Sequence, residues 1–588
     1  MAAVPVHENK SWWSMKTSQW VAFAGEREEQ VFLVLTLLIG ALVGLSVVAF
    51  IVLTERVGAT LDPAGIAKWR RLLVPAAGSL AMGYLLYRFF PDARGSGVPQ
   101  TKAALFAREG KITLSTVLGK FFCTSATLAS GIPLGREGPA VQVGAGIASV
   151  LGRTLGLRPE KVKALIPVGA AAAIAAAFNT PLAAVLFALE EVVSDLHAPV
   201  LGSVVLASAT SWGVLRLLLG NDPLFKVPQY QLVNPWELVV YAILGLAGGL
   251  VSVAFTQLLL RLRKWFLRQP RKTVWFQPLA GGLLVGATGW FMPQVMGVGY
   301  RYVGDALNDN IAVKVMVILL VLKLVATAVS YASGNAGGIF GPSLFMGAML
   351  GGAVGGLAHH FFPGYVATPG AYALVGMGTA FAGVIRAPMT SVVMIFEITR
   401  DYAVIVPLMI SNLVSYFISS RLQREPIYEQ LADQDGIHLP RAKSRQRERQ
   451  RQIIQAMRPA TEFLDAGEPV PSALEKTGAS GYRTWLVRDP SGIIGILNRD
   501  QMLAATQDGE SVKKVRDLVT EPEFPHVHAD QPFDEALARM GSSHTDMLPV
   551  VSRANVHEVL GVVRLQDVLH FYGLHDRGQD WEEDLPRT

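Results

Sequence analysis

A charged pair, Arg136 and Glu137, interrupts a long apolar part of the chain. Residues 121 to 133 before the pair are uncharged, and residues 138 to 152 after it are also uncharged. A carboxylate within a bilayer is costly, so a glutamate at this place is a candidate functional group. The alternative is a loop between two spans in which both side chains are solvated, and this segment alone does not decide between the two.

The residues around the pair favour the first interpretation. The segment is Gly135-Arg136-Glu137-Gly138-Pro139, in which glycines permit a sharp backbone turn and Pro139 suits the first turn of a new helix. A helix that begins inside a membrane presents free N–H groups and the positive end of its dipole. The segment therefore predicts a site for an anion.

Two further glycine-rich breaks have the same form. They are Gly95-Ser96-Gly97-Val98-Pro99 and Gly337-Gly338-Ile339-Phe340-Gly341-Pro342. Three breaks of this kind in one apolar region are difficult to explain as three unrelated loops. We expect each to position the start of a helix.

The composition indicates a membrane protein. Of the 588 residues, 51% are hydrophobic, and the mean hydropathy is +0.36, which is too apolar for a soluble protein of this length. The first span is predicted at Val31–Leu53, which is uncharged and too long for a signal-peptide core. The single cysteine, Cys123, excludes a disulfide framework, and no metal site is predicted. The net charge of +6 is weak evidence about partners, because basic residues in membrane proteins mainly set orientation.

The apolar region consists of two similar halves, at about 30–219 and 235–432. A glycine, a proline and a late glutamate occur in the same order and spacing in both, 207 positions apart: Gly169, Pro181 and Glu190, then Gly376, Pro388 and Glu397. Two homologous halves with interrupted helices are a known plan of transporters, with the binding site near the midplane. In the second half, the span Ile311–Val329 is interrupted by Lys314 and Lys323.

The two ends of the chain differ from this region. Residues 1–29 are predicted to form an interfacial or cytoplasmic segment, and 433–452 a basic linker on the cytoplasmic side. Residues 453–575 have the composition of a soluble domain with two units, each predicted as strand, helix, strand, strand, helix. The second unit is expected to begin with a strand at 525–529, and 576–588 is a tail.

Taken together, these motifs resemble the CLC family of chloride channels and chloride/proton exchangers. The three glycine-rich breaks match its anion-pathway motifs in order, and Tyr428 in the segment PIYEQL matches its fourth element. The resemblance covers residues 30–432. The C-terminal region resembles, more loosely, a pair of CBS modules, which often bind adenine nucleotides.

The resemblance implies a fold class and an assembly. We expect an all-α polytopic membrane domain, built as an inverted repeat of about eighteen helices, many of them tilted or re-entrant, followed by a soluble α/β CBS pair. The family also implies a homodimer with one pore in each subunit. The protein is then an integral, multi-pass protein of the plasma or inner membrane, with both termini and the CBS pair in the cytoplasm.

The resemblance also assigns residues. Ser96 and Tyr428 would hold a central chloride with their hydroxyls, together with the backbone N–H groups of Ile339 and Phe340. The backbone around Gly138 would bind a more external anion. Glu137 would be a gate carboxylate that occupies an anion site when ionised and leaves it when protonated, and Glu191 would be the inner proton-transfer residue. In the family, serine at the position of Ser96 accompanies chloride and proline accompanies nitrate.

Glu191 separates the two main functional hypotheses. Exchangers of this family usually have a glutamate there and passive channels usually do not, so we expect chloride/proton exchange, with a gated chloride channel as the alternative. Each assignment also has a structural alternative. Ser96 would then cap a helix, Tyr428 would be an interfacial anchor, and Glu190 and Glu191 would be solvated carboxylates at a helix end.

Other functions have less support. The sequence contains neither a zinc-protease motif nor a serine nucleophile elbow, so we expect no enzyme activity. No cofactor and no nucleic-acid partner are predicted; the ligands are chloride and protons. The CBS pair is a candidate adenine-nucleotide sensor through Asp567, Arg564 and Asp500. However, the hydroxyl residue that usually precedes the aspartate is missing in both units, so only weak binding is expected.

Overall fold

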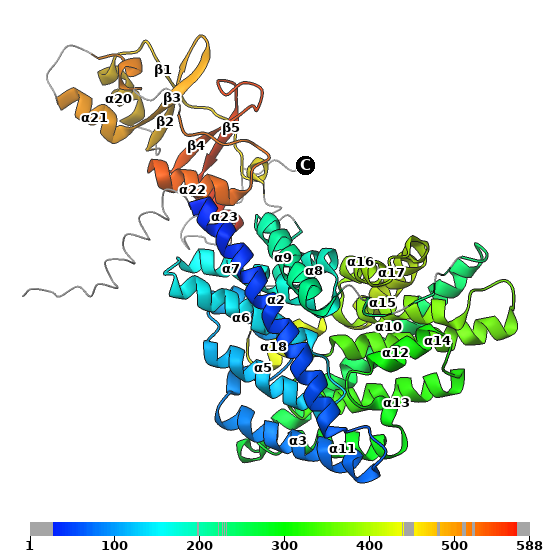
Figure 1. Cartoon of the computed structure of the whole chain (residues 1–588). Coiled ribbons are helices and arrows are strands. Elements are labelled where there is room, and N and C mark those ends of the chain that lie inside the picture. The colour runs from blue at the N-terminus through cyan, green and yellow to red at the C-terminus, as the bar shows by residue number, and fades with distance from the viewer. Residues whose placement is uncertain are drawn as a thin grey trace, which may run out of the picture. The chain divides into compact units, whose positions relative to one another are not determined.

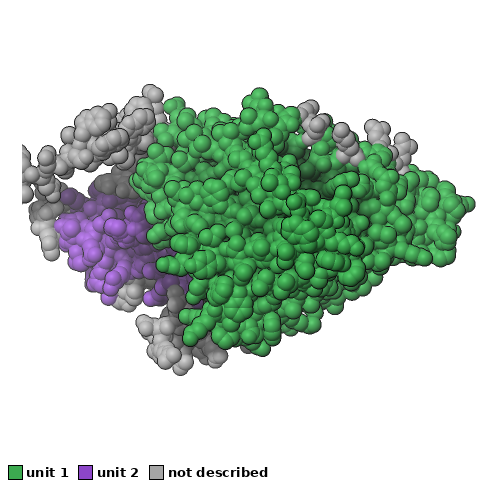
Figure 2. Space-filling model, turned by 60° about the horizontal axis from the view of Figure 1, so that its bottom comes forward, with its two compact units in different colours: residues 1–439 green, residues 440–588 purple. Residues whose placement is uncertain are grey.

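A computed structural model describes most of the chain in two compact units, residues 1–439 and 440–588 (Figure 2). The described residues are 28–196, 199–220, 223–225, 227–228, 230, 232–437, 439, 452–478, 483–507, 513–519 and 524–572. The predicted segment 1–29 lies almost wholly outside these ranges and the tail 576–588 lies wholly outside them, whereas of the predicted linker 433–452 the structure describes 433–437, 439 and 452.

The first unit is helical throughout its described part. Its first half contains α2 (Glu28–Leu61), α3 (Lys68–Arg88), α4 (Val98–Ala107), α5 (Leu114–Ala129), α6 (Glu137–Thr154), α7 (Pro159–Phe178), α8 (Pro181–Phe187), the π-helical turn η2 (Ala188–Val193) and α9 (Leu201–Leu219). Its second half contains α10 (Glu237–Leu267), α11 (Pro278–Phe291), α12 (Tyr300–Leu307), α13 (Val313–Ala332), α14 (Phe340–Phe361), α15 (Pro369–Ile385), α16 (Pro388–Thr399), α17 (Ile405–Leu422) and α18 (Ile427–Gln434). Seven helices among the described residues are long and apolar enough to cross a membrane.

The helix ends differ from the predicted ends of the apolar runs. The first span was predicted at 31–53, but α2 extends from Glu28 to Leu61 and includes Glu55 and Arg56. The reason is that hydropathy marks only the part in hydrocarbon, whereas a helix can continue into the interface where water solvates charges. Likewise α18 ends at Gln434, two residues beyond the predicted end of the membrane domain.

The two halves pack in the same way. In each half the two helices that follow the central motif lie together, α6 with α7 and α14 with α15, and the first long helix packs on the last, α2 on α9 and α10 on α17. Figure 1 shows α2 as the long blue helix across the first half. Between the halves, α3 contacts α11 and α8 contacts α16, so equivalent elements meet each other.

Two reciprocal helix caps join the halves. The Glu190 carboxylate accepts hydrogen bonds from the N–H groups of Met389 (3.3 Å) and Thr390 (2.8 Å), at the start of α16. The equivalent Glu397 carboxylate accepts from Leu182 (3.0 Å) and Ala183 (2.7 Å), at the start of α8. A contact that recurs with its partners exchanged is the signature of two-fold symmetry. The halves are therefore related by a pseudo-two-fold axis, and Glu190 is a cap and not a solvated side chain.

The second unit contains two small sheets. In the first, β1 (Phe463–Asp465) pairs in parallel with β2 (Thr484–Asp489), which pairs antiparallel with β3 (Gly492–Asn498); α20 (Val470–Gly478) and α21 (Arg499–Gln507) complete this part. In the second, β4 (Met547–Val551) pairs antiparallel with β5 (Val559–Arg564), with α22 (Phe533–Ser543) and α23 (Leu565–Phe571). After β1, the first part has the order helix, strand, strand, helix, which is also the order of the second part.

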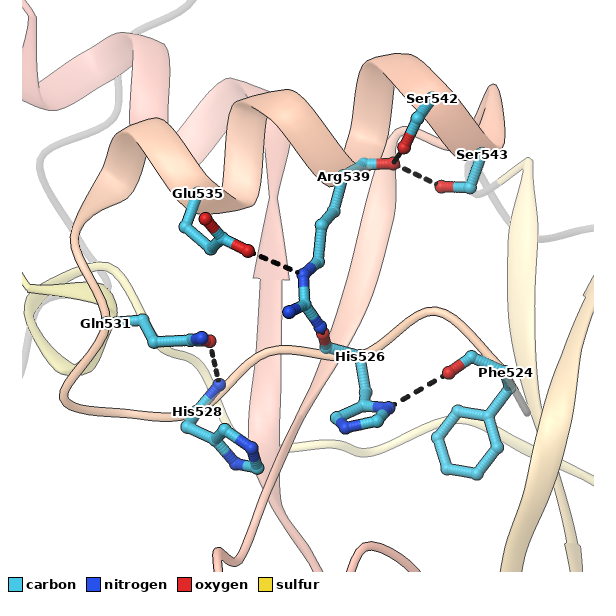
Figure 3. Close-up of polar contacts among 8 residues, drawn as sticks. All are labelled: Phe524, His526, His528, Gln531, Glu535, Arg539, Ser542 and Ser543. Atoms are coloured by element: carbon cyan, nitrogen blue, oxygen red, sulfur yellow. Dashed lines mark hydrogen bonds and ion pairs between the residues drawn. The ribbon is translucent and has the colours of Figure 1, made fainter. Parts of the chain in front are cut away.

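The strand predicted at 525–529 is wrong, because only a single parallel bridge from Val527 to Val550 forms there. Val527 donates to the Pro549 carbonyl (3.0 Å) and accepts from the Val551 N–H (2.9 Å), but the Ala529 carbonyl accepts from the Ile454 N–H (2.9 Å), so the pairing with β4 does not continue. On the opposite edge of this segment, side chains bind the backbone groups of His526 and His528, as Figure 3 shows. Arg539 on α22 donates to the His526 carbonyl, and the His528 N–H donates to the Gln531 side chain (2.8 Å).

Candidate functional site

The two central motifs of the halves are joined directly. Gly135 and Gly338 exchange two backbone hydrogen bonds, 2.7 Å from the Gly135 N–H to the Gly338 carbonyl and 2.8 Å in return. Two residues after these glycines, α6 begins at Glu137 and α14 begins at Phe340. The N-termini of two helices, one from each half, therefore meet at one place.

Glu137 is completely buried at this junction. One of its carboxylate oxygens accepts a hydrogen bond from the Tyr300 hydroxyl, and the other lies 3.3 Å from the N–H of Gly341, in the first turn of α14. An anionic group is stabilised at a helix N-terminus by the dipole and by unpaired N–H groups. The carboxylate thus occupies a place that suits an anion, and the solvated-loop alternative is wrong for Glu137.

Ser96 lies beside the start of α6. It is fully buried, and a side chain added at Gly138 would approach its hydroxyl to 3.0 Å and its carbonyl to 2.5 Å. Gly97, which follows it, has φ +104°, a conformation that favours glycine, and any Cβ there would lie 2.2 Å from the Gly138 carbonyl. The glycines of two motifs therefore allow the backbone that bears Ser96 to approach the backbone around Gly138.

Two hydroxyls at the site are buried without a hydrogen-bond acceptor or donor. Neither Ser96 Oγ nor Tyr428 Oη has a partner of normal geometry among the described residues, although both side chains are fully buried. The two groups are close enough to interact with each other electrostatically. A buried unpaired hydroxyl costs about 1 to 3 kcal/mol, so two together are typical of a site for a ligand that accepts hydrogen bonds.

The start of α14 supplies further donors. Within the described part of the chain, no acceptor is found for the N–H groups of Ile339 and Phe340. Both residues are fully buried, and the Phe340 ring is fixed by Phe178, Phe187 and Phe381, with centroid distances of 5.3, 5.3 and 4.5 Å. These N–H groups belong to a rigid helix start, which suits the role that the resemblance predicts for them.

Glu191 lies in the π-helical turn η2 and is almost fully buried. Its carboxylate is 2.8 Å from the ammonium of Lys102 on α4, and Lys102 is also 4.0 Å from Glu429, the residue after Tyr428. Breaking such a buried pair by removing one partner costs about 3 to 5 kcal/mol. Glu191 is therefore not a solvated carboxylate.

Lys102 and Glu429 were not predicted as site residues. A lysine three positions after an anion-pathway motif was a signal, because a buried lysine needs a partner, but its partner lies 89 positions away. Glu137 and Glu191 do not contact each other directly in the described structure. Tyr428 lies within electrostatic range of both carboxylates that the resemblance assigns to proton transfer.

A cavity of about 570 Å³ reaches the loop that bears Ser96. Gly95 and Tyr331 form part of its lining. Five basic side chains line it, against the two acids Asp92 and Asp435: Arg94, Arg108, Lys111, Arg263 and Arg271. Its excess of positive charge would concentrate anions beside the loop.

In the C-terminal unit, the structure brings Asp567 and Arg564 together as an ion pair. Arg564 Nε is 2.8 Å from one Asp567 oxygen, and Arg458 Nε is 2.9 Å from the other. Both oxygens of this buried carboxylate are therefore already engaged. Asp500, at the equivalent place on α21, is exposed, and no ion pair is found for it among the described residues. Within those residues, no cluster of metal-ligating side chains is found either.

Comparison with known proteins decides the family. The model of the voltage-gated chloride channel family matches residues 78–420, and the model of the CBS domain matches 515–573. The chain belongs to the voltage-gated chloride channel family. The CBS match covers the second of the two C-terminal parts, and the first part repeats its order of helix, strand, strand and helix after β1.

Named relatives of this CLC chain include both predicted classes. The H(+)/Cl(-) exchange transporter ClcA of Vibrio campbellii is 30% identical over 366 residues, which are 61% of this chain and 78% of ClcA. A Ralstonia nicotianae protein, described only provisionally as a ClcB-like chloride channel protein, is 32% identical over 383 residues, 64% of this chain and 89% of that protein.

Solved structures agree with the fold class. A slow cyanobacterial Cl⁻/H⁺ antiporter matches with a TM-score of 0.63 and 26% identity, covering 69% of this chain and 97% of the antiporter. A eukaryotic CLC transporter matches with a TM-score of 0.61 and 21% identity, covering 91% of this chain and 97% of the transporter; this likeness supports the fold alone. The predicted helical CLC domain followed by a small α/β CBS domain is confirmed.

Proposed function

We propose that this CLC protein is a secondary transporter that exchanges chloride for protons across a membrane. The observation that supports this most directly is the place of Glu137, a buried carboxylate at the meeting point of two helix N-termini. A site that holds a carboxylate there also suits chloride, so protonation and departure of Glu137 would couple the two ions. The alternative is a passive chloride channel of the same fold.

The anion path would use moderate donors. The Ser96 and Tyr428 hydroxyls and the N–H groups at the start of α14 offer hydrogen bonds without a fixed full charge. A dehydrated chloride then binds, but not so tightly that it cannot leave. The basic cavity beside Gly95 would be the entrance on one side of the path.

The proton path would branch from the anion path. A row of hydrogen-bond donors provides no acceptor for a proton, so protons need carboxylates. Glu191 would receive a proton from the inner solution and Glu137 would exchange it with the outer solution. Glu191 is paired with Lys102, which is also near the more exposed Glu429, so we expect both neighbours to influence its protonation.

We also propose a homodimer in the plasma or inner membrane, with the CBS domain in the cytoplasm. The apolar side chains of Val406, Met409, Leu413 and Phe417 are each more than half exposed, and their spacing places them on one face of α17. This face needs lipid or another subunit to cover it. Light scattering of the protein in detergent, corrected for the micelle, should give the mass of two chains.

Adenine-nucleotide binding at the CBS domain is proposed to be weak. A ribose could use Asp567 only by displacing Arg458 or Arg564 from its oxygens. Titration calorimetry of the full-length protein with ATP, ADP and AMP should detect weak binding that Asp567→Asn abolishes. Absence of heat with all three nucleotides would exclude a nucleotide role.

Flux from purified protein in liposomes tests the exchange itself. With an outward chloride gradient, the parent should take up protons as chloride leaves. Glu191→Gln should keep chloride flux and lose proton movement, because an amide fits the place but cannot be protonated. Glu137→Ala should also lose proton movement, with chloride flux that is passive and independent of pH.

Glu190→Gln is a matched control, since it changes a neighbouring carboxylate that caps α16 and should leave exchange intact. If the parent moves chloride with no proton movement, the channel alternative replaces the exchanger.

A further inference from the structure

The Tyr300 hydroxyl donates a hydrogen bond to Glu137, although the two residues are 163 positions apart and belong to different halves. Tyr300 is the first residue of α12, after Gly299 with φ +86°. The equivalent helix of the first half, α4, also follows a glycine with positive φ, Gly97, but begins with Val98. The fold therefore accepts an aliphatic side chain at this helix start, and the phenol is a particular feature of the second half.

Several contacts fix the Tyr300 ring. Buried Phe225 meets it edge-on, at a centroid distance of 5.6 Å. The loop before α12 is held by the fully buried ammonium of Lys323, which donates to the carbonyls of Gly297 (2.6 Å) and Val295 (3.0 Å). A hydroxyl on a ring fixed in this way has little freedom to point elsewhere, so its donation to Glu137 is preorganised.

Tyr300 is the better of the two donors to the carboxylate. The other donor, the Gly341 N–H, lies 3.3 Å from Oε2, beyond the usual N–H···O range. A hydrogen bond to an ionised carboxylate favours the ionised form over the protonated form, and charged hydrogen bonds are about twice as strong as neutral ones. Loss of the phenol would therefore affect the ionised gate more than the protonated gate.

The other charged and titratable groups near the gate come from several elements. Arg136 lies 5.7 Å from the Tyr300 ring centroid and 3.6 Å from Glu55 on α2. Lys323 on α13 donates to the Gly297 carbonyl in the loop before Tyr300, and Tyr428 on α18 is within electrostatic range of Glu137. Within the described part of the chain, none of these groups forms a hydrogen bond with the Glu137 carboxylate, whereas the Tyr300 hydroxyl does.

We infer that Tyr300 is a positioning residue of the gate, whose hydroxyl holds ionised Glu137 in the anion path and thereby sets the pH at which the path opens. This inference rests on the proposed exchange of chloride for protons through Glu137. It assigns the two halves different hydroxyls for different tasks, Ser96 for the anion and Tyr300 for the carboxylate that competes with the anion.

Tyr300→Phe tests the inference, because it removes only the hydroxyl and keeps the ring against Phe225. Chloride flux measured against pH in liposomes should show its half-maximal point about one pH unit higher, a tenfold change in proton concentration. Chloride should also bind more tightly in calorimetry at alkaline pH, because the carboxylate competes less. Coupling to protons should remain, since Glu137 and Glu191 are both present.

Tyr302→Phe, on the same helix, is the matched control and should keep the parent pH profile. In a Glu137→Gln background, Tyr300→Phe should have no further effect on the profile, because the ionised partner is absent. If Tyr300→Phe folds poorly, Tyr300→Leu also removes the hydroxyl and should give the same chloride affinity at alkaline pH.

If the parent exchanges protons and Tyr300→Phe keeps the parent pH profile and chloride affinity, the proposed role of Tyr300 is overturned and the exchange function stands. A parent that moves no protons would instead overturn the exchange function, so the two failures are distinguishable.

Discussion

The two halves of the membrane unit use one backbone plan with different side chains at its centre. The segments Gly135-Arg136-Glu137-Gly138-Pro139 and Gly338-Ile339-Phe340-Gly341-Pro342 stand 203 positions apart, and each ends a loop and begins a helix. In the first half the helix starts with a carboxylate whose side-chain hydrogen-bond partner, among the described residues, is Tyr300. In the second half it starts with a ring packed against three other rings.

The two helix starts therefore differ in how firmly their first side chains, Glu137 and Phe340, are held. A carboxylate held by one hydroxyl and one long N–H contact can leave when it is protonated, whereas Phe340 is fixed by burial and aromatic packing. Under the proposed exchange, the symmetric backbone would build the anion site, and the asymmetric side chains would turn one side of it into a gate. The same comparison extends to the loops, in which Ser96 and Tyr300 lie on opposite sides of their N-cap glycines.

The largest expected effect concerns two buried lysines, Lys120 and Lys323, which also stand 203 positions apart. Lys120 donates to the carbonyls of Ala93 (2.9 Å) and Gly95 (2.6 Å), and so holds the loop before Ser96, as Lys323 holds the loop before Tyr300. Lys120→Met and Lys323→Met should each lower the free energy of unfolding by about 3 kcal/mol, because charged hydrogen bonds to buried carbonyls are lost.

Thermal unfolding in detergent would measure the loss of stability, with exposed Lys314→Met on α13 as the control. The functional defects should differ between the halves. Lys120→Met should alter the ratio of chloride to nitrate flux, and Lys323→Met should shift the pH profile. Defects that appear the other way round, or identical defects, would contradict the division of tasks.

The residues of the motifs could be predicted from sequence, but several of their partners could not. Glu137, Ser96 and Phe340 stand in short segments whose glycines and prolines mark helix starts. Tyr300 and Lys102 stand in ordinary helices, and each contacts a carboxylate that is distant in the sequence. Glu137 lies 163 positions from Tyr300, and Glu191 lies 89 positions from Lys102. Lys323 was visible as a charge that interrupts a span, but the sequence did not indicate that backbone carbonyls would satisfy it.

The C-terminal repeat offers the same kind of comparison. Asp567 is buried between Arg458 and Arg564, whereas Asp500 at the equivalent helix start is exposed. Asp567→Asn should lower local stability by about 2 kcal/mol, and Asp500→Asn should change it by less than about 0.5 kcal/mol, since exposed charges contribute little.

Hydrogen exchange of the amides in β5 and α23, measured on the full-length protein, would detect the effect. Protection should fall about thirtyfold for Asp567→Asn and stay near the parent value for Asp500→Asn. Equal protection in both variants would show that the two ion pairs of Asp567 add no net stability.

A smaller effect is expected from the hydroxyl of Ser96. Ser96→Pro removes one neutral donor from the anion site and should change the ratio of chloride to nitrate flux in favour of nitrate, by about five- to tenfold. Ser96→Ala removes the same hydroxyl without the proline ring, and separates the two contributions. A variant that keeps the parent ratio would show that Ser96 does not line the site.

The smallest effect tests the symmetry itself. Glu190 and Glu397 each cap the short helix of the other half through two N–H groups, with matching distances of about 3 Å. Glu190→Gln and Glu397→Gln should each cost about 1 kcal/mol, typical of a lost helix cap, because an amide oxygen accepts more weakly than a carboxylate. Because each cap serves a different helix, the double variant should cost about the sum of the two in thermal unfolding. Unequal single costs would mean that the halves have diverged in stability as well as in function. A double cost well below the sum would mean that α8 and α16 unfold as one unit once either cap is lost.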